Sequence, residues 1–215
     1  MIQVKNVSLA FTKEYYALYN ISLNVAENEK VALLGDSESG KTTLLRVIAG
    51  LENFNRGKVF LKGINLNQVD FKDDISLGYM SNNPVVFSNK TVYENLYYVL
   101  KIRNIDPSSA KIKINQALKQ YEIESLKNIK IKTLSHYQKL IVQFARLSLR
   151  KIELYLIDNI FENTTKQEKD NLIDLIKNLQ KQNATFLIAT NDEQVATQLT
   201  NKIIKIKFGT FDKES

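Results

Sequence analysis

The alternation of apolar and polar positions divides the chain into a strand-rich first part, a helical middle and a mixed last part. Residues 1–34 alternate in the way that strands with one buried face do. Within them, 30–34 is a short run typical of a buried strand. Two further strands are predicted at 58–62 and 76–80.

From about residue 91 to 150 the apolar residues recur at helical spacing. Asp106 followed by Pro107 predicts a helix start, because aspartate caps a helix and proline suits its first position. Strands return at 153–157 and 184–189, and an amphipathic helix is predicted between them. A closing hairpin is predicted from Ile203 to Phe211, broken at Gly209. This order indicates an α/β fold with a parallel-sheet core and a helical insertion.

The segment from Gly35 to Thr42 fits the phosphate-loop pattern G-x-x-x-x-G-K-[ST]. It lies between the predicted strand 30–34 and an amphipathic helix that ends at Gly50, which is the setting the pattern needs. The glycines let successive N–H groups converge on phosphate oxygens, and the loop lysine adds a positive charge. The predicted nucleotide-binding residues of this segment are Gly35, Asp36, Ser37, Glu38, Ser39, Gly40, Lys41, Thr42 and Thr43.

Glu38 places a carboxylate inside a loop that should hold a polyanion. Close to phosphate in a medium of low dielectric constant, like charges repel by several kcal/mol. The carboxylate either weakens binding in this way or turns outward into solvent, and the sequence leaves both alternatives open.

Composition narrows the function classes. A chain of 215 residues suits one domain, or one domain with an inserted lobe. Its net charge of +7 comes from lysines spread along the chain, so nucleic acid is not an expected partner. The chain has no cysteine, no signal-like N-terminal segment and no apolar stretch long enough to span a membrane. These features predict a cytosolic protein.

Four later regions follow the phosphate loop in a fixed order. They are 78–87 with 91–96, Leu134-Ser135-His136-Tyr137-Gln138, Leu154-Tyr155-Leu156-Ile157-Asp158, and 187–192. Taken in order with the phosphate loop, they resemble the Q-loop region, signature motif LSGGQ, Walker B strand and switch strand of ABC (ATP-binding cassette) transporters. The resemblance is to the nucleotide-binding domain of that family and covers essentially the whole chain. Phe11 lies where the family has an aromatic residue that stacks on adenine.

The resemblance implies a P-loop NTPase core with a mostly parallel sheet, an N-terminal antiparallel β subdomain and an inserted helical subdomain. It implies one ABC-type domain over 1–215, with the nucleotide core and β subdomain at about 1–80 and 151–215. The helical subdomain is expected at about 81–150.

The resemblance also implies ligands and partners. ATP and Mg²⁺ are the expected cofactors, with Thr42, Asn82 and Asp158 as metal ligands. An integral membrane transporter subunit and a second nucleotide-binding domain are the expected partners. The expected location is the cytoplasmic side of the cell membrane, bound peripherally to its inner face.

The positions that serve hydrolysis in the family are altered, whereas those that serve binding are kept. Asparagine replaces the Q-loop glutamine, the Walker B glutamate and the switch histidine at Asn82, Asn159 and Asn191. His136 and Tyr137 replace the two signature glycines. Thr165 lies at the D-loop aspartate position. The resemblance implies that Ser135 and Gln138, the signature residues that are kept, contact a partner's ATP. Because asparagine cannot accept a proton from water, the sequence predicts an ATP-binding transport subunit with impaired hydrolysis.

Three alternatives stay open. The chain is an active transport ATPase that tolerates the substitutions, a non-catalytic scaffold of a membrane complex, or, more remotely, a P-loop kinase. Ser135 with Gln138, and Thr165 with Glu168, also fit the helix capping box, which is a purely structural role.

Overall fold

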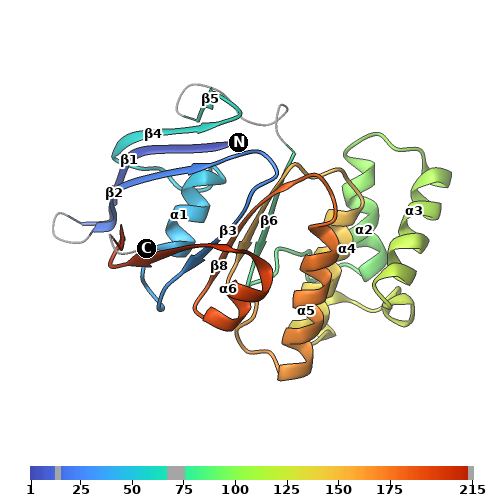
Figure 1. Cartoon of the computed structure of the whole chain (residues 1–215). Coiled ribbons are helices and arrows are strands. Elements are labelled where there is room, and N and C mark those ends of the chain that lie inside the picture. Colours follow the sequence, from blue (N-terminus) through green and yellow to red (C-terminus); the bar gives the residue numbers. More distant parts are fainter. Residues whose placement is uncertain (13–15, 67–75, 213–215) are drawn as a thin grey trace. The chain divides into compact units, whose positions relative to one another are not determined.

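The computed structural model describes residues 1–12, 16–66 and 76–212 (Figure 1). The chain forms two units. The core unit comprises Met1–Tyr79 with Ile152–Ser215, and the helical unit comprises Met80–Lys151. Residues 13–15, which belong to the strand region predicted over 1–34, lie outside the described residues.

One sheet of the core unit is antiparallel and has the strand order β2-β1-β4-β5. Its central strand β1 buries alternate residues at its start and pairs with both neighbours, so that Ile2 lies opposite Val25 and Leu61. The strands are β1 (Ile2–Ala10), β2 (Tyr16–Val25), β4 (Arg56–Leu61) and β5 (Ile64–Asn65). This is the antiparallel β subdomain that the sequence predicts.

The second sheet has the order β10-β9-β3-β8-β7-β6, and its neighbours β9, β3, β8 and β7 are parallel. The carboxyl ends of β3, β8 and β7 therefore meet at one edge, where open α/β sheets bind ligands. The predicted hairpin joins β9 to β10 through Phe208 and Gly209, both at positive φ, as a two-residue type I′ turn requires. The strands are β3 (Lys30–Leu34), β6 (Leu77–Ser81), β7 (Leu154–Asp158), β8 (Thr185–Thr190), β9 (Lys202–Lys207) and β10 (Thr210–Phe211).

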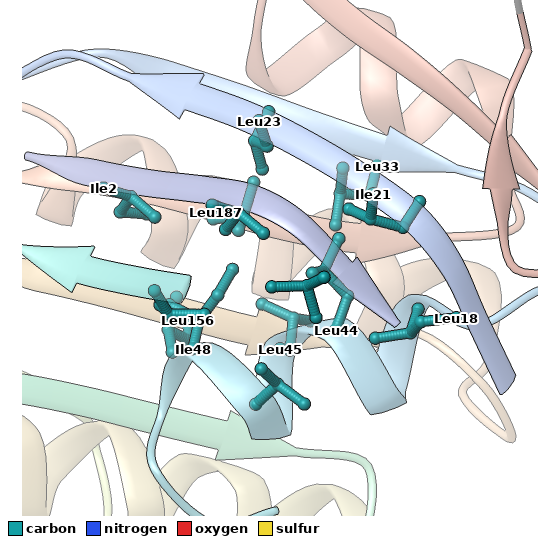
Figure 2. Close-up of a cluster of buried hydrophobic side chains, with 14 of the residues drawn as sticks. Ile2, Leu18, Ile21, Leu23, Leu33, Leu44, Leu45, Ile48, Leu156 and Leu187 are labelled. Atoms are coloured by element: carbon teal, nitrogen blue, oxygen red, sulfur yellow. The ribbon is translucent and has the colours of Figure 1, made fainter. Parts of the chain in front are cut away.

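Helix α1 (Lys41–Ile48) contacts both sheets, through β2 on one side and β7 and β8 on the other. Figure 2 shows its apolar face, with Leu44, Leu45 and Ile48 among the side chains of the core cluster. The helix ends in a Schellman motif, in which the Leu51 N–H bonds to the Arg46 carbonyl and Gly50 has φ 68°. The glycine at the predicted helix end thus has a conformational reason.

Two more helices belong to the core unit. Helix α5 (Lys166–Leu179) begins with the predicted capping box of Thr165 and Glu168. Helix α6 (Glu193–Leu199) contacts β3 and β8 and is capped by Asp192. Strands β7 and β8 each extend one residue beyond the apolar run, because Asp158 and Thr190 still pair with their neighbours.

The helical unit contains α2 (Val92–Lys101), α3 (Pro107–Gln120) and α4 (His136–Ser148), which pack against one another. Two 3₁₀ turns, η1 (Glu124–Leu126) and η2 (Ile131–Thr133), link α3 to α4. Asp106 caps α3 and Pro107 opens it, as predicted. Among the described residues of either unit, no helix is long and apolar enough to cross a bilayer.

Candidate functional site

The phosphate loop connects β3 to α1 at the carboxyl edge of the parallel sheet. Gly40 caps the helix at φ 104°, a left-handed conformation that favours glycine. A Cβ atom at Gly40 would lie 2.7 Å from the Ala17 carbonyl oxygen, and one at Gly35 would collide with the Ile206 carbonyl. Both glycines are therefore required for the chain to pass, before any ligand is considered.

Lys41 is buried, and its ammonium group is folded back onto the loop. It donates hydrogen bonds to the carbonyl oxygens of Gly35 at 2.7 Å and Asp36 at 2.6 Å, and to the Ser39 hydroxyl at 3.1 Å. Burial lowers its pKa, and the negative charges of nearby carboxylates oppose that shift. Three hydrogen bonds thus hold the lysine side chain at the loop.

Asp158 ends β7 and is only 4% exposed. The Thr42 hydroxyl donates to its Oδ1 at 2.8 Å, and the Tyr79 hydroxyl donates to its Oδ2 at 2.7 Å. Burial raises the pKa of Asp158, and these two hydrogen bonds oppose the rise. Burial, together with the charge of Asp158, also raises the pKa of Tyr79. Tyr79 was not predicted as a site residue.

A cavity of about 630 Å³ opens beside the loop, within the range of ~300–1,000 Å³ typical of ligand pockets. Its wall includes residues 37–43 of the loop and α1, with Phe11, Ala17, Asn159 and Glu162. Phe11 is 58% exposed there, so its ring is accessible to a ligand. Glu38 is exposed at φ 63° and also lines the cavity.

Asn159 follows Asp158 at φ 54°, and its side-chain Nδ2 donates to the Glu162 carboxylate. Its Oδ1 is buried, with no hydrogen-bond partner among the described residues. Glu162 is a cavity residue that the sequence reasoning missed. The available signal was an acid four positions after Asp158, in a chain that has an amide where the family has glutamate.

The predicted switch residue Asn191 follows β8 at the same edge, where it is exposed, and the cavity lining does not include it. The other predicted residues belong to the helical unit. Ser135 and Gln138 form a reciprocal capping box at the start of α4. The Nε2 of His136 lies 3.1 Å from the Asn82 Oδ1. Asn82, a predicted metal ligand, therefore has a histidine partner in its own unit.

The donor set beside the loop suits Mg²⁺ on a nucleotide better than a free-standing metal. Across residues 1–12, 16–66 and 76–212, no three or more His, Cys, Asp or Glu side chains gather to hold an ion. Thr42 and Asp158 nevertheless offer two adjacent oxygen ligands. Mg²⁺ is usually held by one or two carboxylates together with substrate phosphates.

Comparison with known proteins decides the family. The family model described as "ABC transporter" matches residues 18–162, well over half of the chain. The chain belongs to the ABC transporter family. The matched residues include the phosphate loop, Asp158 and α4.

Curated ABC proteins align over nearly the whole chain. The sn-glycerol-3-phosphate import ATP-binding protein UgpC of Psychromonas ingrahamii is 29% identical over 99% of this chain and 57% of its own length. The spermidine/putrescine import ATP-binding protein PotA of Legionella pneumophila is 31% identical over 91% of this chain and 54% of its own length. The probable sulfate/thiosulfate import ATP-binding protein CysA of Chlorella vulgaris is 31% identical over 97% of this chain and 88% of its own length. The chain thus spans a little over half the length of the first two relatives.

A solved ABC cassette confirms the fold. The dimeric ATP-binding cassette MJ0796 in a post-hydrolysis state, bound to ADP and phosphate, superposes with a TM-score of 0.89. It is 26% identical, and the match covers 99% of this chain and 97% of that one. The α/β class and the cassette architecture predicted from the ABC resemblance are therefore confirmed.

Proposed function

We propose that this chain is the ATP-binding subunit of an ABC import complex, and that it binds Mg-ATP but hydrolyses it slowly. One contrast carries the proposal. The phosphate loop and the Thr42–Asp158 pair are complete, whereas the residue after Asp158 is an amide rather than a carboxylate. Import is favoured over export because the curated relatives described above are named as import proteins.

In the proposed complex Phe11 stacks on adenine and the N–H groups of the loop hold the phosphates. Lys41 exchanges its present carbonyl partners for phosphate oxygens. Thr42 and Asp158 hold Mg²⁺. The Glu38 carboxylate opposes binding, and removing it should strengthen ATP binding if it faces the phosphates.

Slow hydrolysis follows from the side chains at two junctions. General-base assistance contributes roughly 10²–10⁴-fold to a rate, and Asn159 cannot provide it. Asn191 can donate a hydrogen bond to a phosphate but cannot titrate. The proposed catalytic positions therefore keep their polarity and lose their acid–base chemistry.

A second nucleotide-binding domain is the proposed cytoplasmic partner. Ser135 and Gln138 would contact the partner's ATP, as the signature does in the family. His136 and Tyr137 add side chains where glycines allow the backbone to approach a phosphate closely. In the family, two domains form two ATP sites, and each site combines the phosphate loop of one domain with the signature of the other. This chain is altered both around its own phosphate loop and in its signature. Any pairing therefore leaves each of the two ATP sites altered at least once.

A membrane subunit is proposed to dock on an apolar surface of the helical unit, which consists of Val85, Phe87, Tyr98 and Ile102. All four are exposed; Val85 is 63% exposed and Phe87 42% exposed, which argues against simple burial in the domain's own core. Buried Asn95 fixes the loop that carries Phe87, because its side chain bonds to both the N–H and the carbonyl of Phe87. A rigid loop with exposed apolar side chains suits a partner helix. Docking there would hold the chain at the inner face of the cell membrane.

Calorimetry and turnover of the purified chain test the proposed activity together. We expect Mg-ATP to bind and turnover to stay well below about 1 s⁻¹, the low end of ordinary enzyme rates. Brisk turnover would favour the active ATPase, and absence of ATP binding would favour the scaffold.

Substitution on this apolar surface tests the docking. Phe87→Glu should abolish co-purification with membranes while the far-ultraviolet circular dichroism stays unchanged. Ile112→Glu, at an exposed position on α3 outside this surface, is the matched control and should still co-purify. Equal membrane association of the two variants argues against this surface.

A further inference from the structure

A second carboxylate lines the phosphate end of the cavity. Glu162 lies in the loop between β7 and α5, and it accepts a hydrogen bond from the Asn159 side chain. An ionised carboxylate can only accept hydrogen bonds, so the Asn159 amide must turn its nitrogen toward Glu162. This orientation leaves the Asn159 oxygen buried without a partner among the described residues. A buried unpaired acceptor costs roughly 1–3 kcal/mol. The hydrogen bond to Glu162 therefore forms although it leaves the Asn159 oxygen at this cost.

Glu162 lines the same cavity as Lys41, the proposed phosphate-binding lysine. Three carboxylates act electrostatically on the Lys41 ammonium, and Glu162 is one of them, together with Asp158 and Asp36. Since Lys41 is the group that meets the phosphates in the proposed complex, Glu162 faces the same end of the site. The carboxylate that position 159 lacks is thus supplied three residues later.

We propose that Glu162 accepts the proton of the water that attacks ATP, and that Asn159 is the positioning residue that holds its carboxylate at the cavity wall. This inference rests on the proposed binding of ATP. The water oxygen forms a bond to the γ-phosphorus while the bond from that phosphorus to the β–γ bridging oxygen breaks. The electron pair leaves with ADP, and the water proton passes to a Glu162 oxygen. Hydrolysis is slow because the accepting carboxylate belongs to Glu162, in the loop after Asp158, and not to the residue directly after Asp158.

Glu162→Gln is the decisive variant, because glutamine keeps the size and can still accept from Asn159 but cannot take a proton. Single-turnover hydrolysis should slow at least tenfold, and Mg-ATP affinity should change by less than about threefold; the upper limit of the rate loss is roughly 10⁴-fold. The matched control Glu27→Gln removes an exposed carboxylate in the turn after β2 and should leave both quantities unchanged.

Two results would overturn the inference. Equal single-turnover rates for the wild type and Glu162→Gln, at any absolute level, would show that Glu162 does not accept the proton. Tighter Mg-ATP binding by tenfold or more, with no loss of rate, means that Glu162 only repels phosphate. If the wild type binds no Mg-ATP, the proposed function fails as well, whereas normal binding with equal rates overturns Glu162 alone.

The positioning role has a readout that needs no nucleotide. In the free protein, the Asn159 side-chain amide protons should resonate downfield of those of solvated asparagines, because one is donated to a carboxylate. Glu162→Ala should move that signal to the solvated range, and Asn159→Ala identifies it by its disappearance. An Asn159 signal that is unchanged in Glu162→Ala contradicts the pair.

Discussion

Two junctions at the same edge of the parallel sheet differ sharply in how closely they follow the family pattern. At the β3–α1 junction both glycines, Lys41 and Thr42 are present, and the loop has the backbone that the pattern requires. At the β7–α5 junction only Asp158 is kept, and Asn159 and Glu162 follow it. The Thr42–Asp158 hydrogen bond joins the two junctions directly.

The difference shows which constraints the fold enforces. At the first junction a Cβ atom on either glycine would strike a neighbouring carbonyl, so backbone sterics keep the sequence fixed. At the second junction Asn159 and Glu162 line a cavity and are not part of the apolar core cluster. The proposed binding residues are thus tied to the fold, whereas the proposed catalytic positions are not part of its apolar core.

The largest expected effect comes from removing the lysine of the β3–α1 junction. Lys41→Ala should weaken Mg-ATP binding by about 10–100-fold, because hydrogen bonds to charged groups contribute roughly 1.5–3 kcal/mol. Calorimetry of the variant and of Lys205→Ala, a control at an exposed lysine of β9, measures this. Similar losses in both variants would show that the effect is one of overall charge.

The next effect tests how strongly Asp158 depends on its support. Tyr79→Phe removes the donor to Oδ2 and leaves a buried carboxylate oxygen without that partner. The free energy of unfolding should fall by about 1.5 kcal/mol, the low end of the range for bonds to charged groups. Urea denaturation measures it, with Tyr19→Phe at an exposed tyrosine as the control. An unchanged midpoint in Tyr79→Phe means that solvent replaces the hydroxyl.

Much of this architecture could be predicted from the sequence because local rules determine it. The phosphate loop, Asp106 as a helix cap, Gly50 after α1 and the capping boxes each follow from short-range backbone chemistry. The cassette fold was predicted from the order of the phosphate loop and the four segments that resemble ABC motifs. Of these, only the phosphate loop is specific by itself, and the match to the ABC family model confirms the prediction.

The electrostatic arrangement of the site could not be predicted in the same way. Tyr79 reaches Asp158 from a strand 79 positions earlier, and only the strand order of the sheet brings them together. Glu162 lines the cavity after a turn in which Asn159 has positive φ, and no sequence pattern indicates that turn. Periodicity and capping patterns contain no information about such contacts.

Repair of the altered junction at one position should return little activity. Asn159→Glu restores the family residue but places a second carboxylate beside Glu162, and like charges at close range repel. We expect less than a tenfold gain in turnover, well short of the roughly 10²–10⁴-fold that a general base provides. The double variant, Asn159→Glu with Glu162→Ser, should have a higher turnover than Asn159→Glu alone. Equal turnover of the two variants would show that the carboxylates do not interfere.

The smallest effect belongs to the third junction of this edge, where β8 meets α6. The Asp192 carboxylate caps α6 through Gln194 and Val195 and accepts from Lys169 at 2.7 Å. The hydrogen bond from Lys169 and the helix N–H groups lower the pKa of Asp192, while partial burial opposes the shift. A carboxyl whose pKa is lower in the folded state adds stability above its unfolded value of about 3.9, and that stability is lost as the pH falls through the folded value.

Asp192→Ala should therefore lower the free energy of unfolding by about 1 kcal/mol at pH 7, the usual cost of losing a helix cap. The difference from the wild type should shrink in urea denaturation at pH 3, where Asp192 is protonated in the unfolded chain. Asp192→Asn keeps the cap and loses the ion pair, so it should cost less than Asp192→Ala at pH 7, because exposed ion pairs contribute ~0–1 kcal/mol. A loss that is the same at both pH values would mean that the charge of Asp192 does not stabilise this junction, and that neutral capping alone holds α6 beside the site.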